Sequence, residues 1–360
     1  MKVGLLTFQY ASNYGAQMQI CASLVYLKKK QINPIVINRL PDSRKKANFR
    51  TRLIRAFSDI PFRRFRKKYV SPITRAYYSN KEMQAINQLG FDAIIVGSDQ
   101  IWRSDYTGVG YNYFLDFVTN RDVRKIAYAA SFGHDYLLDT DEWKQHVKML
   151  LHDFYSISVR EDSGITICMK YFGVEAIHVL DPTLLLSKFD YISEFQLKEK
   201  KKPLGLITYM LDYTSLKRNL VEEVADILNL SCTDLLSYSR SKSKWTRYFI
   251  NPLREPSVKK WLSRLLNAEF IVTDSFHGMV FSIIFNKRFI VLANQKRGVS
   301  RMKSLLRLLD LEDRLVDMEG SGCLSDIKKL VMKNIDFHSV NARLELNKKM
   351  SDNYIVKALS

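Results

Sequence analysis

The first half of the chain alternates short apolar runs with longer segments whose apolar residues recur every three to four positions. The short runs predict buried strands, and the longer periodic segments predict helices. The expected strands are residues 2–7, 34–38, 92–96, 125–129, 155–159 and 176–179, and the expected helices are residues 16–30, 81–89 and 141–152. Strands that alternate with helices in this order predict a doubly wound parallel sheet.

A second series of the same kind begins after a lysine-rich polar stretch that ends at Lys202 and Pro203. Its expected strands are residues 204–209, 233–237, 270–273 and 289–292, and its expected helices are residues 216–228, 257–267, 278–285 and 301–309. We therefore expect an α/β protein of two Rossmann-like domains, residues 1–182 and 183–340, which face each other across a cleft. Residues 341–360 are expected to form a closing helix.

The balance of charge adds a possible partner to this picture. The 360 residues include 56 Lys and Arg against 37 Asp and Glu, which gives a formal charge of +19. Residues 39–75 form a basic insertion in the first domain, with thirteen basic residues, two acids and interleaved apolar residues such as Phe49 and Phe62. This stretch can dock on an anionic membrane surface, or it can be a solvated connector whose apolar residues cover the domain. We expect no nucleic-acid partner, because no helix-turn-helix, RNP or zinc-finger pattern accompanies the charge.

The remaining totals bear on the class of protein, its location and metal binding. The 46% hydrophobic and 26% charged content is typical of a globular protein, and two domains fit the length. The apolar start is broken by Gln9 and Ser12, so we expect no signal peptide and a cytoplasmic protein, with contact at the inner face of the membrane left open. The four cysteines lack metal-site spacing, which predicts reduced thiols and no metal site; they are Cys21, Cys168, Cys232 and Cys323.

The first polar loop follows strand 2–7. Asn13 can cap the next helix, and Tyr14 and Gly15 open that helix, where an anion or a sugar hydroxyl can approach the free N–H groups. An ordinary loop with a good cap has the same pattern, so the motif is weak by itself.

A second loop, after strand 92–96, carries Gly97, Ser98, Asp99, Gln100 and Trp102. Asp99 could orient a sugar hydroxyl or accept its proton, Gln100 could hydrogen-bond the ring, and Trp102 offers a flat apolar face for stacking. The structural alternative is that Ser98 and Asp99 only cap the following turn.

Arg160 stands at the end of strand 155–159, where its guanidinium could bind a carboxylate or a phosphate. The alternative is an intramolecular pair with Glu161 or Asp162.

The second domain presents its candidates after strands 270–273 and 289–292. Ser275, Phe276, His277 and Gly278 follow the first of these strands, with Gly278 expected to clear space beside the imidazole. His277 is suited to move protons near neutral pH, although a histidine that only satisfies backbone groups at a helix start is common. The second strand is followed by a group of cations that includes Arg297 and Arg301.

Taken together, these motifs resemble the polysaccharide pyruvyl transferase family over most of the chain. The matching segments are residues 7–8, 13–16, 96–102, 158–163, 181–183 and 273–278. The resemblance implies a fold like that of GT-B glycosyltransferases, with the acceptor on the first domain and the donor on the second. In that family an arginine often stands two residues before the histidine, whereas this chain has Ser275, which leaves open which cation replaces it.

The implied reaction transfers a pyruvyl group from phosphoenolpyruvate to two hydroxyls of a sugar in a bacterial cell-surface polysaccharide, such as a capsule or exopolysaccharide, or in its lipid-linked precursor. His277 is the expected general acid/base, Asp99 the second catalytic residue, and Arg160, Arg297 and Arg301 the donor's ligands. The resemblance implies phosphoenolpyruvate as the donor substrate and no cofactor. The alternatives are a glycosyltransferase that uses a nucleotide-sugar and a non-catalytic carbohydrate-binding protein.

Overall fold

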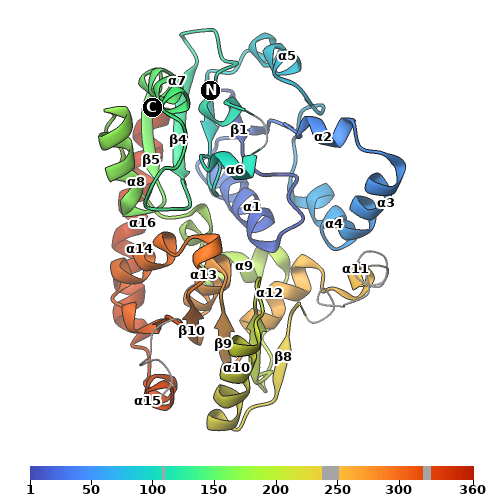
Figure 1. Ribbon diagram of the computed structural model, residues 1–360, viewed down its shortest axis with the longest axis vertical. Helices are drawn as coiled ribbons and strands as arrows, with labels where there is room; N and C mark the ends of the chain where they lie inside the picture. Colours follow the sequence, from blue (N-terminus) through green and yellow to red (C-terminus); the bar gives the residue numbers. More distant parts are fainter. Residues whose placement is uncertain (108–109, 237–250, 319–325) are drawn as a thin grey trace. The chain divides into compact units, whose positions relative to one another are not determined.

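The computed structural model describes residues 1–107, 110–236, 251–318 and 326–360, and the chain falls into two compact units (Figure 1). The first unit contains Met1–Arg55, Arg66–Leu185 and Leu346–Ser360. The second contains Ala56–Phe65 and Leu186–Glu345. The basic stretch is therefore divided between the units, and the last residues of the chain belong to the first one.

The first unit is built on a six-stranded parallel sheet in the order β2-β1-β3-β4-β5-β6. The strands are β1 (Val3–Leu6), β2 (Ile35–Val36), β3 (Ala93–Val96), β4 (Arg124–Ala130), β5 (Ser156–Val159) and β6 (Ile177–His178). All of β1 and β3 is buried, as expected for parallel strands that are covered on both faces. Each strand overlaps one of the six predicted for this half of the chain.

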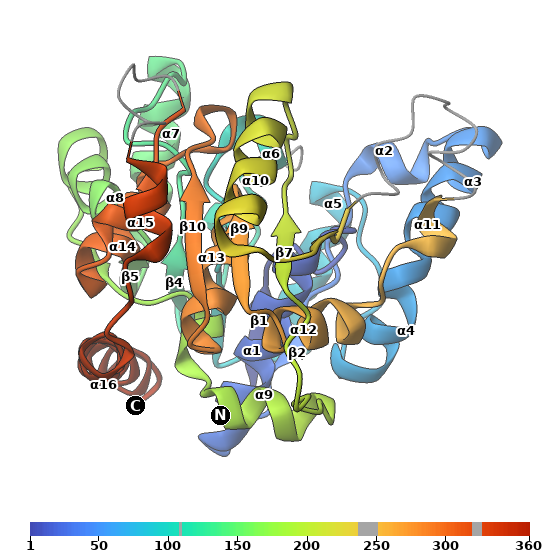
Figure 2. The same ribbon diagram turned by 90° about the horizontal axis from the view of Figure 1, so that it is seen from below.

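The second unit repeats the design with a five-stranded parallel sheet in the order β11-β10-β9-β7-β8; strands β10, β9 and β7 lie side by side in Figure 2. The strands are β7 (Leu206–Tyr209), β8 (Cys232–Asp234), β9 (Phe270–Thr273), β10 (Arg288–Leu292) and β11 (Leu315–Val316). Four of them were predicted, and residue 237, the end of predicted strand 233–237, lies outside the described residues. The two-residue strand β11 was missed.

Helices connect the strands in both units. In the first unit they are α1 (Tyr14–Lys29), α2 (Asp42–Lys45), α5 (Asn80–Met83), α6 (Ser104–Thr107), α7 (Asp141–His152) and α8 (Asp162–Ile167). In the second they are α9 (Lys188–Phe195), α10 (Ser215–Leu228), α11 (Asn251–Arg254), α12 (Val258–Leu266), α13 (Phe276–Ile284), α14 (Ser300–Leu309) and α15 (Ile327–Met332). Three more, α3 (Phe49–Ser58), α4 (Ile60–Tyr69) and α16 (Phe337–Leu359), each contribute residues to both units.

Both sheets have a topological switch point. The chain leaves β1 toward β2 on one side and returns to β3 on the other, so the loops after β1 and β3 diverge at the carboxyl edge of the first sheet. The loops after β7 and β9 do the same in the second unit. Ligands of open α/β sheets bind in the crevice at this point, which directs the search for a site to four loops.

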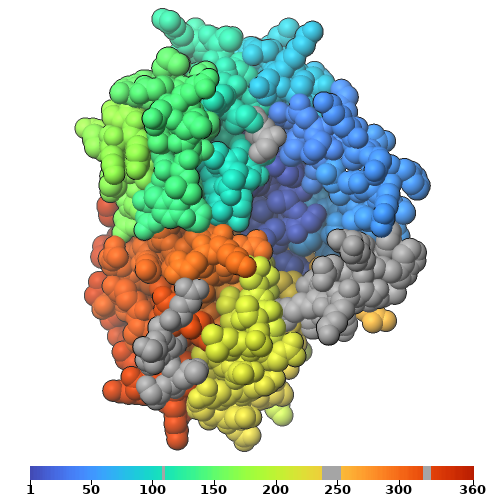
Figure 3. Space-filling view, in the orientation of Figure 1, coloured from blue at the N-terminus to red at the C-terminus, as the bar shows by residue number. Residues whose placement is uncertain are grey.

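The basic insertion is helical. Its segments α2, α3 and α4 carry most of the cations on exposed positions, and they contribute to the blue part of the surface in Figure 3. Phe62 and Phe65 of α4 are buried, whereas Phe49 of α3 is 81% exposed. Apolar residues in this stretch therefore serve two purposes, since some complete a core and others remain on the surface.

The end of α16 belongs to the first unit because its side chains bond to that unit's sheet. The Tyr354 hydroxyl donates to the carbonyl of Ala127 in β4 at 2.8 Å, and the Ser351 hydroxyl accepts from the N–H of Leu180 at 2.9 Å. Asp352 also accepts a hydrogen bond from the Tyr26 hydroxyl of α1. Within the described part of the chain, no helix combines the length and apolarity needed to cross a membrane.

Candidate functional site

The loop after β3 is held tightly in the first unit. Gly97 has φ 124°, and a Cβ atom there would lie 2.1 Å from the carbonyl oxygen of Tyr128, so only glycine fits. The next residue, Ser98, is fully buried, and its hydroxyl lies 3.0 Å from both the Ala129 carbonyl and the Asp181 carboxylate. The predicted ligand contacts of Gly97 and Ser98 are therefore replaced by contacts within the protein.

Arg160 extends this buried network. Its guanidinium donates to Asp181 Oδ2 at 2.9 Å and lies 3.6 Å from Asp99 Oδ1. Burial tends to lower the pKa of Arg160, but the neighbouring carboxylates of Asp181, Asp99 and Glu161 outweigh it and raise the pKa above its ordinary value. The side chain of Arg160 is 1% exposed and faces protein carboxylates, and its role as a ligand of the donor stays a prediction.

Asp99 is the more accessible member of the same group. Its side chain is 15% exposed, its φ is 78°, and its carboxylate accepts from the N–H of Gln100 at 2.9 Å. Gln100 is 7% exposed and its amide oxygen accepts from Arg103 at 3.2 Å. The catalytic role of Asp99 stays a prediction.

Trp102 does not offer a stacking face. The ring is 1% exposed, stacks on Phe114 with centroids 5.5 Å apart, and is covered by Phe132. Its indole N–H donates to the Tyr113 carbonyl at 3.0 Å. The prediction is therefore wrong, since this tryptophan is part of the hydrophobic core.

The loop after β1 begins α1 as the sequence suggested. The Asn13 carboxamide accepts from the N–H of Ala16 at 3.2 Å, which caps the helix, and Tyr14 and Gly15 are buried in its first turn. Thr7 joins this loop to the one after β3 by donating to the Ser98 carbonyl at 3.0 Å. The two loops of the switch point are thus in direct contact.

In the second unit, Asp274 organises the switch point. This fully buried carboxylate directly follows β9 and accepts from the N–H groups of Leu211 and Asp212, at 2.5 and 3.1 Å, in the loop after β7. The Lys217 ammonium donates to it at 2.6 Å and the Asn294 amide at 3.1 Å. One side chain therefore connects the loops after β7, β9 and β10.

A second ion pair lies at the same edge. Arg297 donates twice to the Asp212 carboxylate, at 2.8 and 3.3 Å, and both side chains are more than a third exposed. These bonds lower the pKa of Asp212 to about 2, although partial burial acts in the opposite direction. Arg297 is thus held at a partly open position by a carboxylate that stays ionised at neutral pH.

His277 lies in the first turn of α13, next to Phe276, whose ring also contacts the other predicted cation, Arg301. Its ring centroid is 5.3 Å from that of Phe276, and the Arg301 guanidinium lies 5.5 Å from the Phe276 ring. Arg301 also donates to the Arg297 carbonyl at 2.7 Å. The structure thus gathers a histidine and two arginines at one edge of the sheet, with His277 6% and Arg301 5% exposed.

Two neighbours of His277 have structural roles that differ from the prediction. Ser275 is the N-cap of α13 and accepts from the N–H of Gly278 at 3.5 Å. A Cβ atom on Gly278 would lie 2.2 Å from Thr273 Oγ1, so the space beside this glycine is filled by the strand below it. Gly278 therefore does not clear room for a ligand but lets α13 pack closely on β9.

Several residues that organise the site were missed from the sequence. Asp181 and Asp274 appeared in the motifs without a role, while Asp212 and Asn294 were not singled out. The usable signal was the position of each within three residues after the carboxyl end of a strand.

The comparison with protein families is decisive for classification. The model of the polysaccharide pyruvyl transferase family matches residues 13–296, which include the loops after β3, β7 and β9 but neither most of the loop after β1 nor Arg297 and Arg301. The chain belongs to this family. The predicted family is therefore confirmed, and with it the assignment to transferases. A search of curated proteins gave no significant match.

The fold is shared with sugar-processing enzymes. A glycosyltransferase from Rickettsia africae superposes with a TM-score of 0.56 at 11% identity, covering 100% of this chain and 98% of that one. A UDP-GlcNAc 2-epimerase from Neisseria meningitidis bound to UDP-GlcNAc gives 0.54 at 11% identity, covering 100% and 99%. A putative UDP-N-acetylglucosamine 2-epimerase from Listeria monocytogenes gives 0.55 at 10% identity, covering 99% and 95%. The predicted α/β fold with two parallel sheets, similar to GT-B proteins, is confirmed.

Proposed function

We propose that the protein transfers a pyruvyl group from phosphoenolpyruvate to two hydroxyls of one sugar in a bacterial cell-surface polysaccharide or its lipid-linked precursor. The observation that carries the proposal is the grouping of His277, Arg301 and Arg297 at the carboxyl edge of the second sheet, within a chain that belongs to this family. A proton carrier beside cations suits a donor with both a carboxylate and a phosphate.

The chemistry assigns a task to each group. A proton is delivered to the methylene carbon of phosphoenolpyruvate, and the first sugar hydroxyl adds to the neighbouring carbon. Phosphate then leaves as the second hydroxyl closes the cyclic ketal, so that one hydroxyl proton ends on the new methyl group and the other on phosphate. His277 is the proposed acid/base, Asp99 the proposed acceptor of a hydroxyl proton, and Arg297 and Arg301 the proposed donor ligands in place of the arginine absent at Ser275.

Phosphate release measured with phosphoenolpyruvate and acceptor tests His277. We expect His277→Gln to lower the rate at least ~10²-fold, the lower end of general acid/base contributions. His338→Gln, which changes an exposed histidine outside the switch point, is the matched control and should leave the rate unchanged. Release by His277→Gln at the parent rate would remove His277 from the mechanism.

A nucleotide-sugar donor is the competing proposal, because the Neisseria protein of the same fold holds UDP-GlcNAc. Thermal unfolding in the presence of phosphoenolpyruvate, UDP-GlcNAc or UDP separates the two. We expect stabilisation by phosphoenolpyruvate. Stabilisation by the nucleotides alone favours a glycosyltransferase, and binding of sugar without turnover of either donor favours a carbohydrate-binding protein.

Contact with an anionic membrane is proposed for the exposed part of the basic insertion. Arg63, Arg64 and Lys68 of α4 are exposed, as is Phe49 of α3. Replacement of these three cations by glutamine should weaken sedimentation with phosphatidylglycerol vesicles while turnover of a water-soluble acceptor is unchanged. Equal sedimentation of parent and variant contradicts the proposal.

A further inference from the structure

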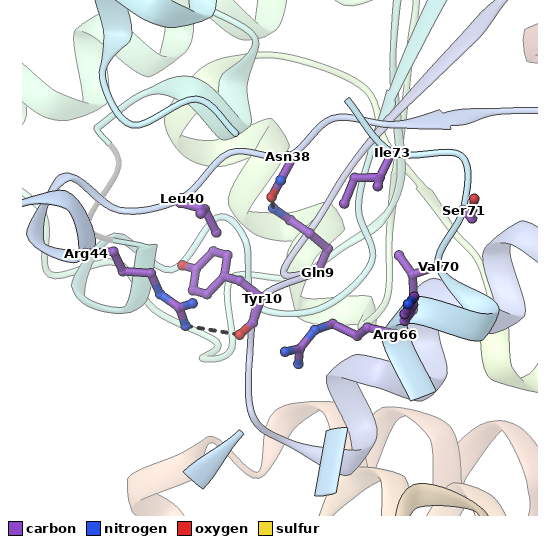
Figure 4. A pocket seen from close by; sticks show the side chains of 10 residues that line it. Gln9, Tyr10, Asn38, Leu40, Arg44, Arg66, Val70, Ser71 and Ile73 are labelled. Atoms are coloured by element: carbon purple, nitrogen blue, oxygen red, sulfur yellow. Dashed lines mark hydrogen bonds between the residues drawn. The ribbon is translucent and has the colours of Figure 1, made fainter. Parts of the chain in front are cut away.

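A cavity of about 370 Å³ lies in the first unit beside the switch point (Figure 4). It opens at the carboxyl ends of β1 and β2, because Gln9 and Tyr10 come from the loop after β1 and Asn38 follows β2. The opposite wall is formed by the basic insertion, which supplies Arg44, Arg66 and Lys67 and the apolar residues Leu40, Val70 and Ile73. The insertion therefore completes a cavity that the sheet alone would leave open.

The polar groups of this cavity are fixed in place. The Gln9 amide nitrogen donates to the Arg39 carbonyl at 2.8 Å and to Asn38 Oδ1 at 3.2 Å, as Figure 4 shows for the second bond. Arg44 donates to the Tyr10 carbonyl at 3.1 Å, and its guanidinium lies 4.8 Å from the centre of the Tyr10 ring. A ligand thus meets an arginine that is already oriented.

The charge of the lining selects the ligand. Three of the ten described residues that line the cavity are cations, and none of those ten is an acid. A carboxylate would balance one of these charges, whereas a phosphate carries up to two charges and three oxygens that a guanidinium fork and an ammonium can share. The volume of about 370 Å³ falls within the range for small-molecule sites, near its lower end. It can hold a phosphate with a sugar ring attached.

A second cavity is also lined by cations but has a different position on its sheet. It measures about 390 Å³ and is lined by Lys200, Lys260 and Arg264 in the second unit, but it lies beside the start of β7, among Leu204 and Ile207. Ligands of such sheets bind at the carboxyl ends of strands, so this cavity lacks the position that the first one has.

We propose that the cavity of Gln9, Asn38, Arg44 and Lys67 binds the acceptor through a phosphate attached to its sugar. The inference rests on the proposed function and adds the substrate class to it: the acceptor is a phosphorylated saccharide, modified before it is polymerised, and not a finished neutral polysaccharide. The basic insertion is then part of acceptor recognition in addition to any contact with a membrane.

Binding measured by calorimetry tests the assignment with three probes: N-acetylglucosamine 1-phosphate, N-acetylglucosamine and inorganic phosphate. We expect the sugar phosphate to bind more tightly than either fragment. Lys67→Gln should weaken it about tenfold, because one hydrogen bond to a charged group contributes about 1.5 kcal/mol. Lys68→Gln is the matched control, since it removes the same charge from the next residue of α4, which does not line the cavity.

Each other outcome overturns the proposal. If the sugar and the sugar phosphate bind with equal affinity, the phosphate does not contribute to binding. If inorganic phosphate binds as tightly as the sugar phosphate, the sugar does not contribute. Equal losses of affinity in Lys67→Gln and Lys68→Gln indicate an effect of overall charge. Failure of the sugar phosphate to bind also refutes it.

Binding of phosphoenolpyruvate distinguishes a failure of this proposal from a failure of the proposed reaction. We expect its binding to be unchanged by Lys67→Gln, whereas loss of phosphoenolpyruvate binding in that variant would assign the cavity to the donor and overturn the inference. If instead phosphoenolpyruvate fails to bind the parent protein, the reaction is wrong while the phosphate site stands or falls on its own probes.

Discussion

At the scale of single residues, Asp274 is the side chain on which the second unit's candidate site depends. Its carboxylate is fully buried and accepts four hydrogen bonds, one of them from the Lys217 ammonium, which is 8% exposed. Asp274→Asn leaves that ammonium buried without its charge partner, so we expect a loss of about 3 kcal/mol in the free energy of unfolding. Urea unfolding followed by circular dichroism measures it.

A surface carboxylate provides the control for this prediction. Asp310 pairs with Arg343 at 3.1 Å, but the two side chains are 73% and 50% exposed, so Asp310→Asn should change the free energy by less than about 1 kcal/mol. A second variant, Asp274→Asn with Lys217→Met, removes the uncompensated charge and should recover part of the loss. Equal unfolding midpoints for parent and Asp274→Asn would show that the buried pair does not stabilise the unit.

The sequence located the loops of the site better than the roles of their residues. It correctly placed Asn13 as a cap and Asp99 at a strand end, because caps and strand ends are local features. Asp181 pairs with the buried Arg160, and Phe132 covers the ring of Trp102. Both partners are distant in the sequence from the residue that they contact, so a local motif does not reveal them. An arginine at a strand end looks the same in sequence whether a ligand or a buried carboxylate faces it.

At the scale of elements, the close packing of α13 on β9 makes Gly278 sensitive to substitution. A Cβ atom there would lie 2.2 Å from Thr273 Oγ1, which itself donates to the Tyr209 carbonyl at 2.6 Å. We expect Gly278→Ala to destabilise the protein by about 1–3 kcal/mol, as is usual for overpacking. Helix propensity alone predicts the opposite sign, since alanine is favoured over glycine by about 1 kcal/mol within a helix.

Thermal and urea unfolding of a double variant show which effect dominates. Thr273→Ala removes the hydroxyl that meets the new methyl group, so Gly278→Ala should cost less in that background than in the parent. A stabilised Gly278→Ala protein would mean that α13 is free to move away from the strand.

The elements themselves were predictable to different degrees. Buried parallel strands such as β3 and β9 are continuous apolar runs, and every predicted strand was found at its place in the chain. Helices α3 and α4 of the basic insertion were missed. Charged residues surround the few apolar ones, such as Phe62 and Phe65, so the sequence shows no clear helical spacing of apolar residues, although both side chains are buried in the structure. The two-residue strand β11 owes its existence to pairing with β10 and has no signal of its own.

At the scale of the whole molecule, the chain's last residues stabilise its first unit. Residues Leu346–Ser360 belong to that unit, and Tyr354 and Ser351 bond to Ala127 and Leu180. Deletion of residues 346–360 should therefore lower hydrogen-exchange protection in β4 and β5, whose backbone loses the cover and hydrogen bonds of α16. The strands β9 and β10 lie in the other sheet and should keep their protection.

A milder change tests the same link without shortening the chain. The Tyr354 hydroxyl donates to the Ala127 carbonyl at 2.8 Å and lies 2.9 Å from the Ser156 hydroxyl, so Tyr354→Phe leaves a buried carbonyl without this donor. The Ser158 hydroxyl still donates to this carbonyl at 2.9 Å, so we expect a cost of about 0.5–1.5 kcal/mol, with faster exchange limited to β4 and β5. Exchange that accelerates equally in both sheets would mean that the units unfold together, and unchanged exchange in β4 would contradict the role of the helix.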